Sequence, residues 1–288
     1  MKAWYKLNRN PHGLPFKNDS WCSTYCVWRK IFSPAQLPQV SEIESLLDAS
    51  LLRWPYFSIL QDGKSPSPTS YTKTRDVIGQ KCEGFADARA IWNVIGGGAT
   101  LKLNDLSDWN RGVRKLVKEI EACLNVAATS YAFLTPDKNR GMLPHRDAAH
   151  VFAFQIEGVK EWHIYANNRD NPSHAGLDVD AIRPIDVIGL EPGDVLYLPH
   201  GLPHDAFARQ GRSFHLTVTA CEPSPEDLLE GLLKQFKETY PDLIHRHHAY
   251  SLPEKCDIVR NRLLSLVRSD RSIAWLESAL AHRRAEEA

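Results

Sequence analysis

The chain has 288 residues, of which 43% are hydrophobic and 24% are charged, values typical of a soluble globular protein with one large domain and room for a smaller one. Lysine plus arginine and aspartate plus glutamate both number 35, and this formal net charge of zero argues against a general attraction to nucleic acid or anionic membranes. The sequence has no apolar run long enough to cross a bilayer, no secretory signal, and six cysteines without a CxxC pair. We therefore expect a cytoplasmic protein with reduced thiols, no membrane partner and no clear nucleic-acid binding.

The front of the chain, residues 1–95, is predicted to be an α/β segment that covers the core. Aromatic side chains without a clear period are frequent up to about Pro38. A capping-box pattern predicts a helix from Ser41 to Leu52, and WPYFSIL is a short strand candidate. The Ser- and Pro-rich stretch from Asp62 to Asp76 is predicted to be a surface loop.

The middle of the chain, residues 96–221, is dominated by short strand patterns. After a short strand at Ala99–Leu103 and an amphipathic helix at Asp108–Leu124, the apolar segments are TSYAFLT, HVFAFQI, VKEWHIY, DVIGL, GDVLYLP, HDAFA and SFHLTVTA. HVFAFQI and VKEWHIY are expected to form a hairpin around Glu157 and Gly158. Short strands at this density predict an antiparallel sandwich or barrel.

The end of the chain, residues 222–288, is predicted to be helical. Three segments have the required pattern: SPEDLLEGLLKQFKETY, LPEKCDIVRNRLLSLVRSD and SIAWLESALAHRRAEEA. Ser224 and Asp227 form an approximate capping box at the start of the first one. The sequence thus predicts an α/β front, a β core and a helical tail.

Candidate metal ligands lie at two places in the β region. In the stretch LPHRDAAHVFAFQ, His145 and Asp147 would project from the same face of a strand. The segment LEPGDVLYLPHGLPHDA brings His200 and His204 to the end of an apolar strand, and these two compete for the third position. Two histidines and a carboxylate form a facial triad that suits non-haem Fe(II). Each part also has an ordinary interpretation, since HxD triplets occur by chance and strand-end histidines are often only hydrogen-bonded.

Lys160 is a further candidate, at the start of VKEWHIY. A buried ammonium needs an anionic partner, which the carboxylate of a cofactor could provide. A solvated lysine at a sheet edge is the alternative. His150, His163 and His215 lie on or beside strands and could support the site or belong to the core.

The segments GATLKLND, YAFLTPDKNRGMLPHRD, FQIEGVKEWHIY, LEPGDVLYLPHGLPHDA and SFHLTVT occur in the order and at the spacings of a known family. From about Gly98 to Thr219 the chain resembles the JmjC-type cupin Fe(II)/2-oxoglutarate-dependent oxygenases, closest to the bacterial ribosomal oxygenase (cupin-4) branch. The resemblance implies a mostly β fold with flanking helices: a double-stranded β-helix (jelly-roll, JmjC-like) core at 96–221 and a C-terminal helical segment.

The resemblance also implies roles for individual residues. His145, Asp147 and His204 match the catalytic iron ligands, which favours His204 over His200. Lys160 matches the lysine that pairs with the distal carboxylate of 2-oxoglutarate.

The family's NxYxTP segment is altered here, where it reads YAFLTP. Tyr131 stands in place of the asparagine and Phe133 in place of the tyrosine, and a phenylalanine cannot donate a hydrogen bond to the co-substrate. Thr135, Lys160 and His215 remain as expected co-substrate neighbours. We therefore expect an altered pocket that retains its iron ligands.

The function implied by the resemblance is hydroxylation of an amino-acid side chain with Fe(II), 2-oxoglutarate and dioxygen (O2), and with release of succinate and CO2. The substrate is expected to be a protein, a peptide or an amino-acid-derived molecule, and a homodimer is expected through the C-terminal helices. Two alternatives stay open: a metal-dependent cupin dioxygenase or isomerase that does not use 2-oxoglutarate, and a non-catalytic JmjC-like binding module. Lys160 distinguishes the 2-oxoglutarate-dependent hydroxylase from the first alternative, since a buried lysine here has a clear role only if a dicarboxylate binds.

Overall fold

The chain divides into two compact units in the computed structural model. The described residues are 16, 21, 23–61, 63–166, 175–177, 179, 181–268, 277 and 279–281. One unit comprises Met1–Leu124 with Ala128–Ala220, and the other comprises Asn125–Ala127 with Cys221–Ala288. The division of the chain at residues 95 and 221 stays a prediction.

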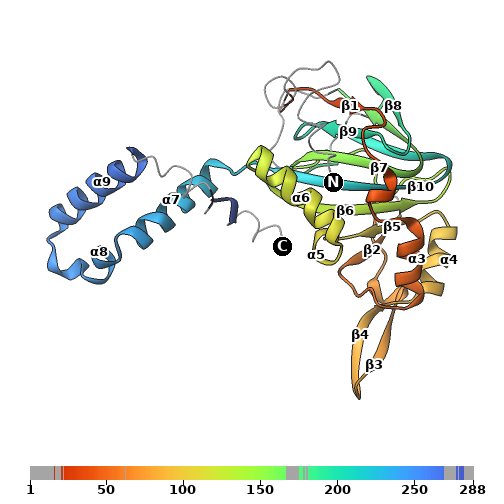
Figure 1. The fold of residues 1–288 in the computed structure, drawn as a ribbon, viewed down its shortest axis with the longest axis horizontal. Helices are drawn as coiled ribbons and strands as arrows, with labels where there is room; N and C mark the ends of the chain where they lie inside the picture. The colour runs from red at the N-terminus through yellow and green to blue at the C-terminus, as the bar shows by residue number, and fades with distance from the viewer. Residues whose placement is uncertain are drawn as a thin grey trace. The chain divides into compact units, whose positions relative to one another are not determined.

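The first unit is built on an eight-stranded sheet with the order β1-β9-β7-β10-β6-β5-β2, to which β8 is added beside β7 (Figure 1). Its strands are β1 (Cys26–Trp28), β2 (Phe57–Leu60), β5 (Thr100–Leu103), β6 (Ala127–Thr135), β7 (His150–Ile164), β8 (Asp186–Leu190), β9 (Val195–Leu198) and β10 (His204–Cys221). β7 pairs antiparallel with β8, β9 and β10. The predicted mostly β, antiparallel core with flanking helices is confirmed.

The two longest strands, β7 and β10, run side by side through the centre of the sheet (Figure 1). The predicted hairpin at Glu157 and Gly158 is wrong, because β7 continues through these residues as one strand. HDAFA and SFHLTVTA likewise form one strand. The pairing of β7 with β10 is irregular here, with register shifts between Ala208 and His215. Gly158 lies opposite Arg212 in this part of the ladder and has a φ of +68°.

Apolar side chains from the central strands form the core of this unit. A cluster of fully or almost fully buried residues comprises Val151, Ala153, Trp162, Ile164, Ile188, Leu190, Leu196 and Leu198. All four residues of β9 are buried, so this strand is covered on both faces. Burial of this apolar area is the main term that stabilises the sheet.

Helices of the first unit are α3 (Val40–Asp48), α4 (Ala88–Gly96), α5 (Leu106–Trp109) and α6 (Arg111–Leu124), with a 3-10 turn η1 at Pro34–Gln36. The helix predicted from Ser41 begins one residue earlier, after Gln39, without a side-chain cap, and Glu44 pairs with Arg212 instead. The helix predicted over Asp108–Leu124 is two helices. Asn110 interrupts them, and its side-chain oxygen accepts a hydrogen bond from the Val113 amide.

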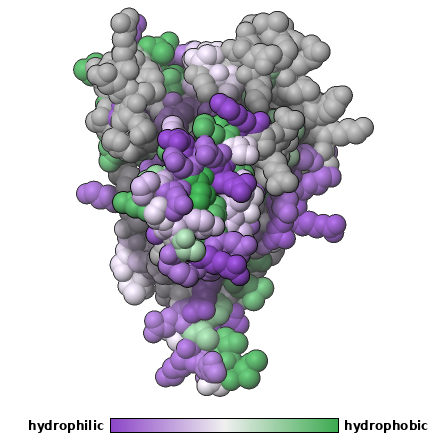
Figure 2. Space-filling model, turned by 90° about the vertical axis from the view of Figure 1, so that its left-hand side faces the viewer, coloured by the Kyte–Doolittle hydropathy of each residue, from purple (hydrophilic) through white to green (hydrophobic). Residues whose placement is uncertain are grey.

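A separate two-stranded hairpin, β3 (Thr72–Val77) with β4 (Gln80–Ala86), extends away from the main sheet (Figure 1). The prediction of a loop up to Asp76 is therefore wrong from Thr72 onward; a 3-10 turn, η2 (Pro68–Ser70), precedes the strand. Ile78 and Gly79 both have positive φ, as a two-residue hairpin turn requires. Ile78 is 99% exposed, and Figure 2 shows apolar side chains at this end of the hairpin.

The second unit contains α7 (Pro225–Thr239), α8 (Pro241–His245), the turn η3 (His247–Ala249) and α9 (Leu252–Arg268). The predicted capping box at Ser224 and Asp227 is confirmed: the Asp227 amide donates to Ser224 Oγ at 3.1 Å, and the Ser224 amide donates to Asp227 Oδ2 at 2.7 Å. Most of the third predicted helix, 272–288, lies outside the described residues. Within the described part of the chain, no helix combines the length and the apolarity that a bilayer crossing demands.

Replacement of Gly158 by alanine tests the bulge in the β7–β10 ladder. An added Cβ would lie 2.0 Å from the Arg212 carbonyl oxygen, and the positive φ is costly for any L side chain. We expect a loss of more than about 2 kcal/mol in the free energy of unfolding, measured by urea denaturation. Gly79→Ala is the matched control, since Gly79 has a φ of +74° but nothing within 4 Å of the added atom. Equal losses in both variants would contradict the account.

Candidate metal centre

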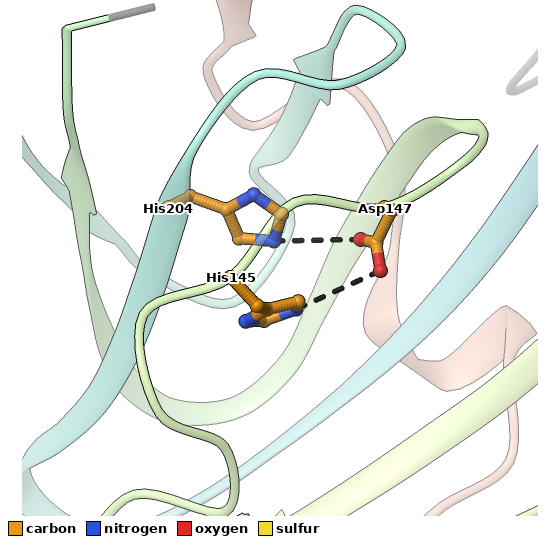
Figure 3. A group of neighbouring side chains, drawn as sticks. All are labelled: His145, Asp147 and His204. Carbon is orange, nitrogen blue, oxygen red and sulfur yellow. Dashed lines mark ion pairs between the residues drawn. The ribbon is translucent and has the colours of Figure 1, made fainter. Parts of the chain in front are cut away.

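Three side chains converge at one point in the first unit (Figure 3). His145 Nε2 lies 3.6 Å from Asp147 Oδ1, and His204 Nε2 lies 3.5 Å from Asp147 Oδ2. One ligand atom from each residue can be chosen so that all three lie within 4.8 Å of one another. Two imidazole nitrogens and one carboxylate form a donor set suited to a divalent transition metal. The side chain of Asp147 is 30% exposed, so the group remains accessible from outside.

The two histidine rings are oriented by the same local hydrogen bond. His145 Nδ1 lies 2.8 Å from the Leu143 carbonyl oxygen, and His204 Nδ1 lies 2.8 Å from the Leu202 carbonyl oxygen. A carbonyl can only accept, so each Nδ1 carries the proton and each Nε2 presents a lone pair. Burial, followed by the charge of His145, lowers the pKa of His204 to about 4, which keeps this ring neutral at physiological pH.

Backbone pairing brings the two histidines together. The His145 amide donates to the His204 carbonyl at 3.0 Å, and the His204 amide donates to the His145 carbonyl at 2.9 Å. His204 begins β10, whereas His145 and Asp147 precede β7, which starts at His150. The expectation that His145 and Asp147 project from a regular strand is therefore wrong. An isolated antiparallel bridge, with Asp147 following it, places the side chains instead.

His200 does not join this group. Its amide donates to the ring of His150, which also lies 3.0 Å from the Tyr197 hydroxyl and stacks on Trp21. Burial lowers the pKa of His150 to about 3, so this ring is a neutral member of the core. Between the two candidates left open by the strand pattern, the geometry favours His204.

Lys160 lies in the interior and is only 2% exposed. Its Nζ donates to Thr135 Oγ1 at 2.8 Å, and Thr100 Oγ1 donates to the same atom at 3.1 Å. Among the described residues, no carboxylate forms an ion pair with this ammonium group. Burial lowers the pKa of Lys160 to about 7, as expected for an ammonium that has lost its hydration without gaining an anion. A buried ammonium of this kind provides a binding position for a carboxylate.

Aromatic side chains connect Lys160 with the triad. The ring of Phe133 stacks on His215 at 5.1 Å, and Trp162 contacts both His215 and His204. His215 Nδ1 and Trp162 Nε1 are buried and have no hydrogen-bond partner among the described residues. Burial, and then the charge of Lys160, holds the pKa of His215 well below its usual range. The region between the triad and Lys160 therefore contains unsatisfied polar atoms.

Two residues of β5, Thr100 and Lys102, also face this region, and the sequence analysis missed them. Leu101 and Leu103 are fully buried on the other face of the strand, so Thr100 and Lys102 point together toward the opposite side. Lys102 pairs with Phe133 across β5 and β6. The period of two in GATLKLND places Thr100 and Lys102 on one face, but only the register with YAFLTP shows which side chains they meet.

A polar network on the opposite face of β10 fixes the strand next to His204. Asp205 is 1% exposed and accepts hydrogen bonds from Tyr165 Oη at 3.2 Å and Arg140 Nη1 at 3.4 Å, and His163 Nδ1 lies 3.0 Å from its Oδ1. Burial first, and then Asp205, raises the pKa of Tyr165 to about 12. His163 thus supports the strand from behind and does not enter the metal centre.

Residues 109–228 match the JmjC domain family (JmjC_2). The chain is 29% identical over 156 residues to the bifunctional lysine-specific demethylase and histidyl-hydroxylase NO66 of Drosophila persimilis, which covers 52% of this chain and 23% of that protein. It is 31% identical over 159 residues to ribosomal oxygenase 1 of Rattus norvegicus, which covers 52% of this chain and 26% of that protein. The chain therefore spans only about a quarter of the length of these curated relatives.

The solved structures support the same relationship at the level of fold. The E. coli ribosomal oxygenase YcfD, in complex with cobalt and 2-oxoglutarate, superimposes with a TM-score of 0.57 at 19% identity, covering 92% of this chain and 69% of that one. Another structure of E. coli YcfD gives a TM-score of 0.58, covering 89% and 68%. The predicted resemblance and the JmjC-like cupin fold are confirmed: residues 109–228 match the JmjC domain family, and the fold is similar to that of the ribosomal oxygenase YcfD.

Proposed function

We propose that this protein is an Fe(II)- and 2-oxoglutarate-dependent oxygenase that hydroxylates an amino-acid side chain. One observation carries the proposal: a triad of His145, Asp147 and His204 shares an interior with Lys160, a buried ammonium that pairs with no carboxylate of the described residues. The first group is suited to a metal and the second to the distal end of a dicarboxylate. The names of the curated relatives and the cobalt and 2-oxoglutarate bound by YcfD support the same reading.

The residues of the triad fit Fe(II) by their chemistry. Two neutral imidazoles and one carboxylate are the ligands of the facial triad, and both Nε2 atoms are already directed by backbone hydrogen bonds. When bound, Fe(II) with 2-oxoglutarate and O2 supplies the oxidising chemistry, and the co-substrate leaves as succinate and CO2. In this proposal the chain holds and orients the ligands.

The interior also fits 2-oxoglutarate. In the proposed complex, Lys160 and Thr135 bind its distal carboxylate, and Thr100 adds a hydroxyl through Thr135. The unpartnered His215 Nδ1 offers a further hydrogen bond near Lys160. Phe133 cannot donate, so Thr135 and His215 take over polar contacts that the family assigns to a tyrosine. Tyr131 and Phe133 then serve as the aromatic wall of the pocket.

A protein, a peptide or an amino-acid-derived molecule is the proposed substrate. The relatives are named histidyl-hydroxylase and ribosomal oxygenase, which favours a protein side chain. A cytoplasmic location is part of the proposal, and the free thiols of Cys26, Cys82, Cys123, Cys221 and Cys256 are compatible with it.

We further propose a homodimer that forms through the C-terminal helices. Few side chains of α7 and α9 are buried, whereas Leu229, Leu233, Val259, Leu264 and Val267 are 43–66% exposed. Leu229 and Leu233 are four residues apart and share one face of α7. A second copy of this helical unit would cover such an apolar surface.

The test of the proposed function is succinate formation. The protein is loaded anaerobically with Fe(II) and 2-oxoglutarate, and succinate is measured after air is admitted, with Asp147→Ala as the control. We expect slow turnover without substrate that is lost in the control. Iron binding without any 2-oxoglutarate binding would contradict the proposal and favour a cupin dioxygenase or isomerase, with Phe133 as the reason. Binding of neither would favour a non-catalytic module.

Replacement of Asp147 by alanine is expected to weaken Fe(II) binding by at least about a hundredfold, because it removes the only carboxylate of the triad. Anaerobic calorimetry measures the affinity. Asp76→Ala, an exposed aspartate on β3, is the matched control and should bind Fe(II) like the unmodified protein. Unchanged affinity in Asp147→Ala would place the metal elsewhere.

The affinity for 2-oxoglutarate is expected to depend on pH through Lys160. The pKa of this group is lowered to about 7, so below pH 7 the ammonium already carries the proton that a carboxylate requires. Above pH 7 binding must take up a proton, and the affinity should fall about tenfold per pH unit. His215, the other titratable group facing it, is already neutral in this range. Lys160→Arg should bind without this slope; an equal slope in both proteins would contradict the assignment.

Replacement of Leu233 by glutamate is expected to weaken the proposed dimer by at least about tenfold, because it puts a charge into an apolar contact. Sedimentation over a concentration series measures the dimerisation constant. Lys234→Gln, an exposed neighbour on α7, should leave it unchanged. A monomeric unmodified protein, or an unaffected dimer in Leu233→Glu, would overturn the assignment.

A further inference from the structure

A second ammonium group, that of Lys102, is close enough to Asp147 to interact with its charge, and the proposed binding of 2-oxoglutarate does not use it. Lys160 on β7 is buried and bonded to Thr135, whereas Lys102 is half-buried on β5, which pairs with β6. The register pairs Lys102 with Phe133, so both side chains lie on the face of the sheet that carries the aromatic wall. The interior therefore has two cationic positions, one deep and one closer to the surface.

The ring of Tyr131 holds Lys102 in position. Lys102 Nζ lies 4.2 Å from the centroid of this ring, a cation–π contact. Tyr131 and Phe133 are two residues apart on β6 and share a face, so the ammonium rests against an aromatic surface. Tyr131 stands where the family resemblance expects asparagine, and this difference provides the aromatic ring that the Lys102 ammonium contacts.

Lys102 has no anionic contact of its own. Among the described residues, no hydrogen-bond acceptor and no carboxylate lies within bonding distance of its Nζ. Asp105 and Asp147 act on it only through space: burial lowers the pKa of Lys102, and these two charges partly offset that effect. A cation that has lost part of its hydration and rests on an aromatic ring favours an incoming anion.

We propose that Lys102 binds a carboxylate of the primary substrate and so selects an acidic substrate at the metal centre. The inference rests on the proposed function, because it assumes that the substrate is oxidised at a metal held by His145, Asp147 and His204. It adds a substrate class: an amino acid, or a residue of a peptide, with a free carboxylate near the reacting carbon. Lys102 is then a specificity residue, and Tyr131 positions it.

The test compares acidic and neutral probes that are otherwise matched. The side-chain pair is N-acetylglutamate N-methylamide with N-acetylglutamine N-methylamide, and the main-chain pair is N-acetylalanine with N-acetylalaninamide. Binding to the protein loaded anaerobically with Fe(II) and 2-oxoglutarate is measured by calorimetry. We expect the acidic member of at least one pair to bind about tenfold more tightly than its amide. Preference within the first pair indicates a side-chain carboxylate, and preference within the second indicates a free α-carboxylate.

The variants assign the preference to Lys102. Lys102→Gln should abolish it, Lys102→Arg should keep it by retaining the charge, and Lys118→Gln, an exposed lysine on α6, should behave like the unmodified protein. Loss of a nearby positive charge should not weaken Fe(II) binding in Lys102→Gln. The proposal is overturned if no acidic probe binds or is preferred, or if the preference survives in Lys102→Gln. It is also overturned if this variant binds Fe(II) more weakly, since Lys102 would then hold Asp147 in place. Failure to bind Fe(II) and 2-oxoglutarate at all would instead count against the proposed function.

Discussion

The reciprocal backbone hydrogen bonds between His145 and His204 are the contact on which the proposed metal centre depends. They join a segment that precedes β7 to the first residue of β10, and they hold two imidazoles side by side. The orientation of both imidazole rings is restricted, because each Nδ1 is hydrogen-bonded to the backbone carbonyl two residues earlier. Behind this bridge, the long β7–β10 ladder and the buried Asp205 network keep the strand from shifting. The ligand geometry is thus a property of the sheet itself.

Charge is the second constraint on the interior. Lys160 is buried, and no carboxylate of the described residues pairs with it; this is unfavourable in the protein alone and would become favourable with the proposed dicarboxylate bound. Lys102 repeats the pattern with a half-buried ammonium on an aromatic ring. Lys160 and the proposed metal centre lie at opposite ends of a region lined by aromatic side chains. This arrangement would orient 2-oxoglutarate with its distal carboxylate toward Lys160. Two buried polar atoms that have no partner in the described part of the chain, His215 Nδ1 and Trp162 Nε1, lie within this same region.

The β core, the helices after residue 222 and the convergence of His145, Asp147 and His204 could be predicted from the sequence, because local patterns and a specific set of motifs carry them. The continuous strand through Gly158 could not be predicted, since a β-bulge and a hairpin turn have the same sequence signal when the partner strand is unknown. The strand at Thr72 was missed because polar, exposed strands resemble loops. Lys102 was missed for a related reason: its role depends on the register between β5 and β6, and register is a long-range property.

The measurement that tests the account most directly is a double-mutant-type thermodynamic cycle, which gives the coupling free energy between Lys160 and the distal carboxylate of the co-substrate. Anaerobic affinities are measured for 2-oxoglutarate and for 2-oxopentanoate, which lacks that carboxylate, with the unmodified protein and with Lys160→Met. If Lys160 receives the carboxylate, loss of either partner should cost most of the affinity and loss of both little more, with a coupling free energy of at least about 2 kcal/mol. Additive losses would contradict the account, because the buried ammonium would then have some other partner.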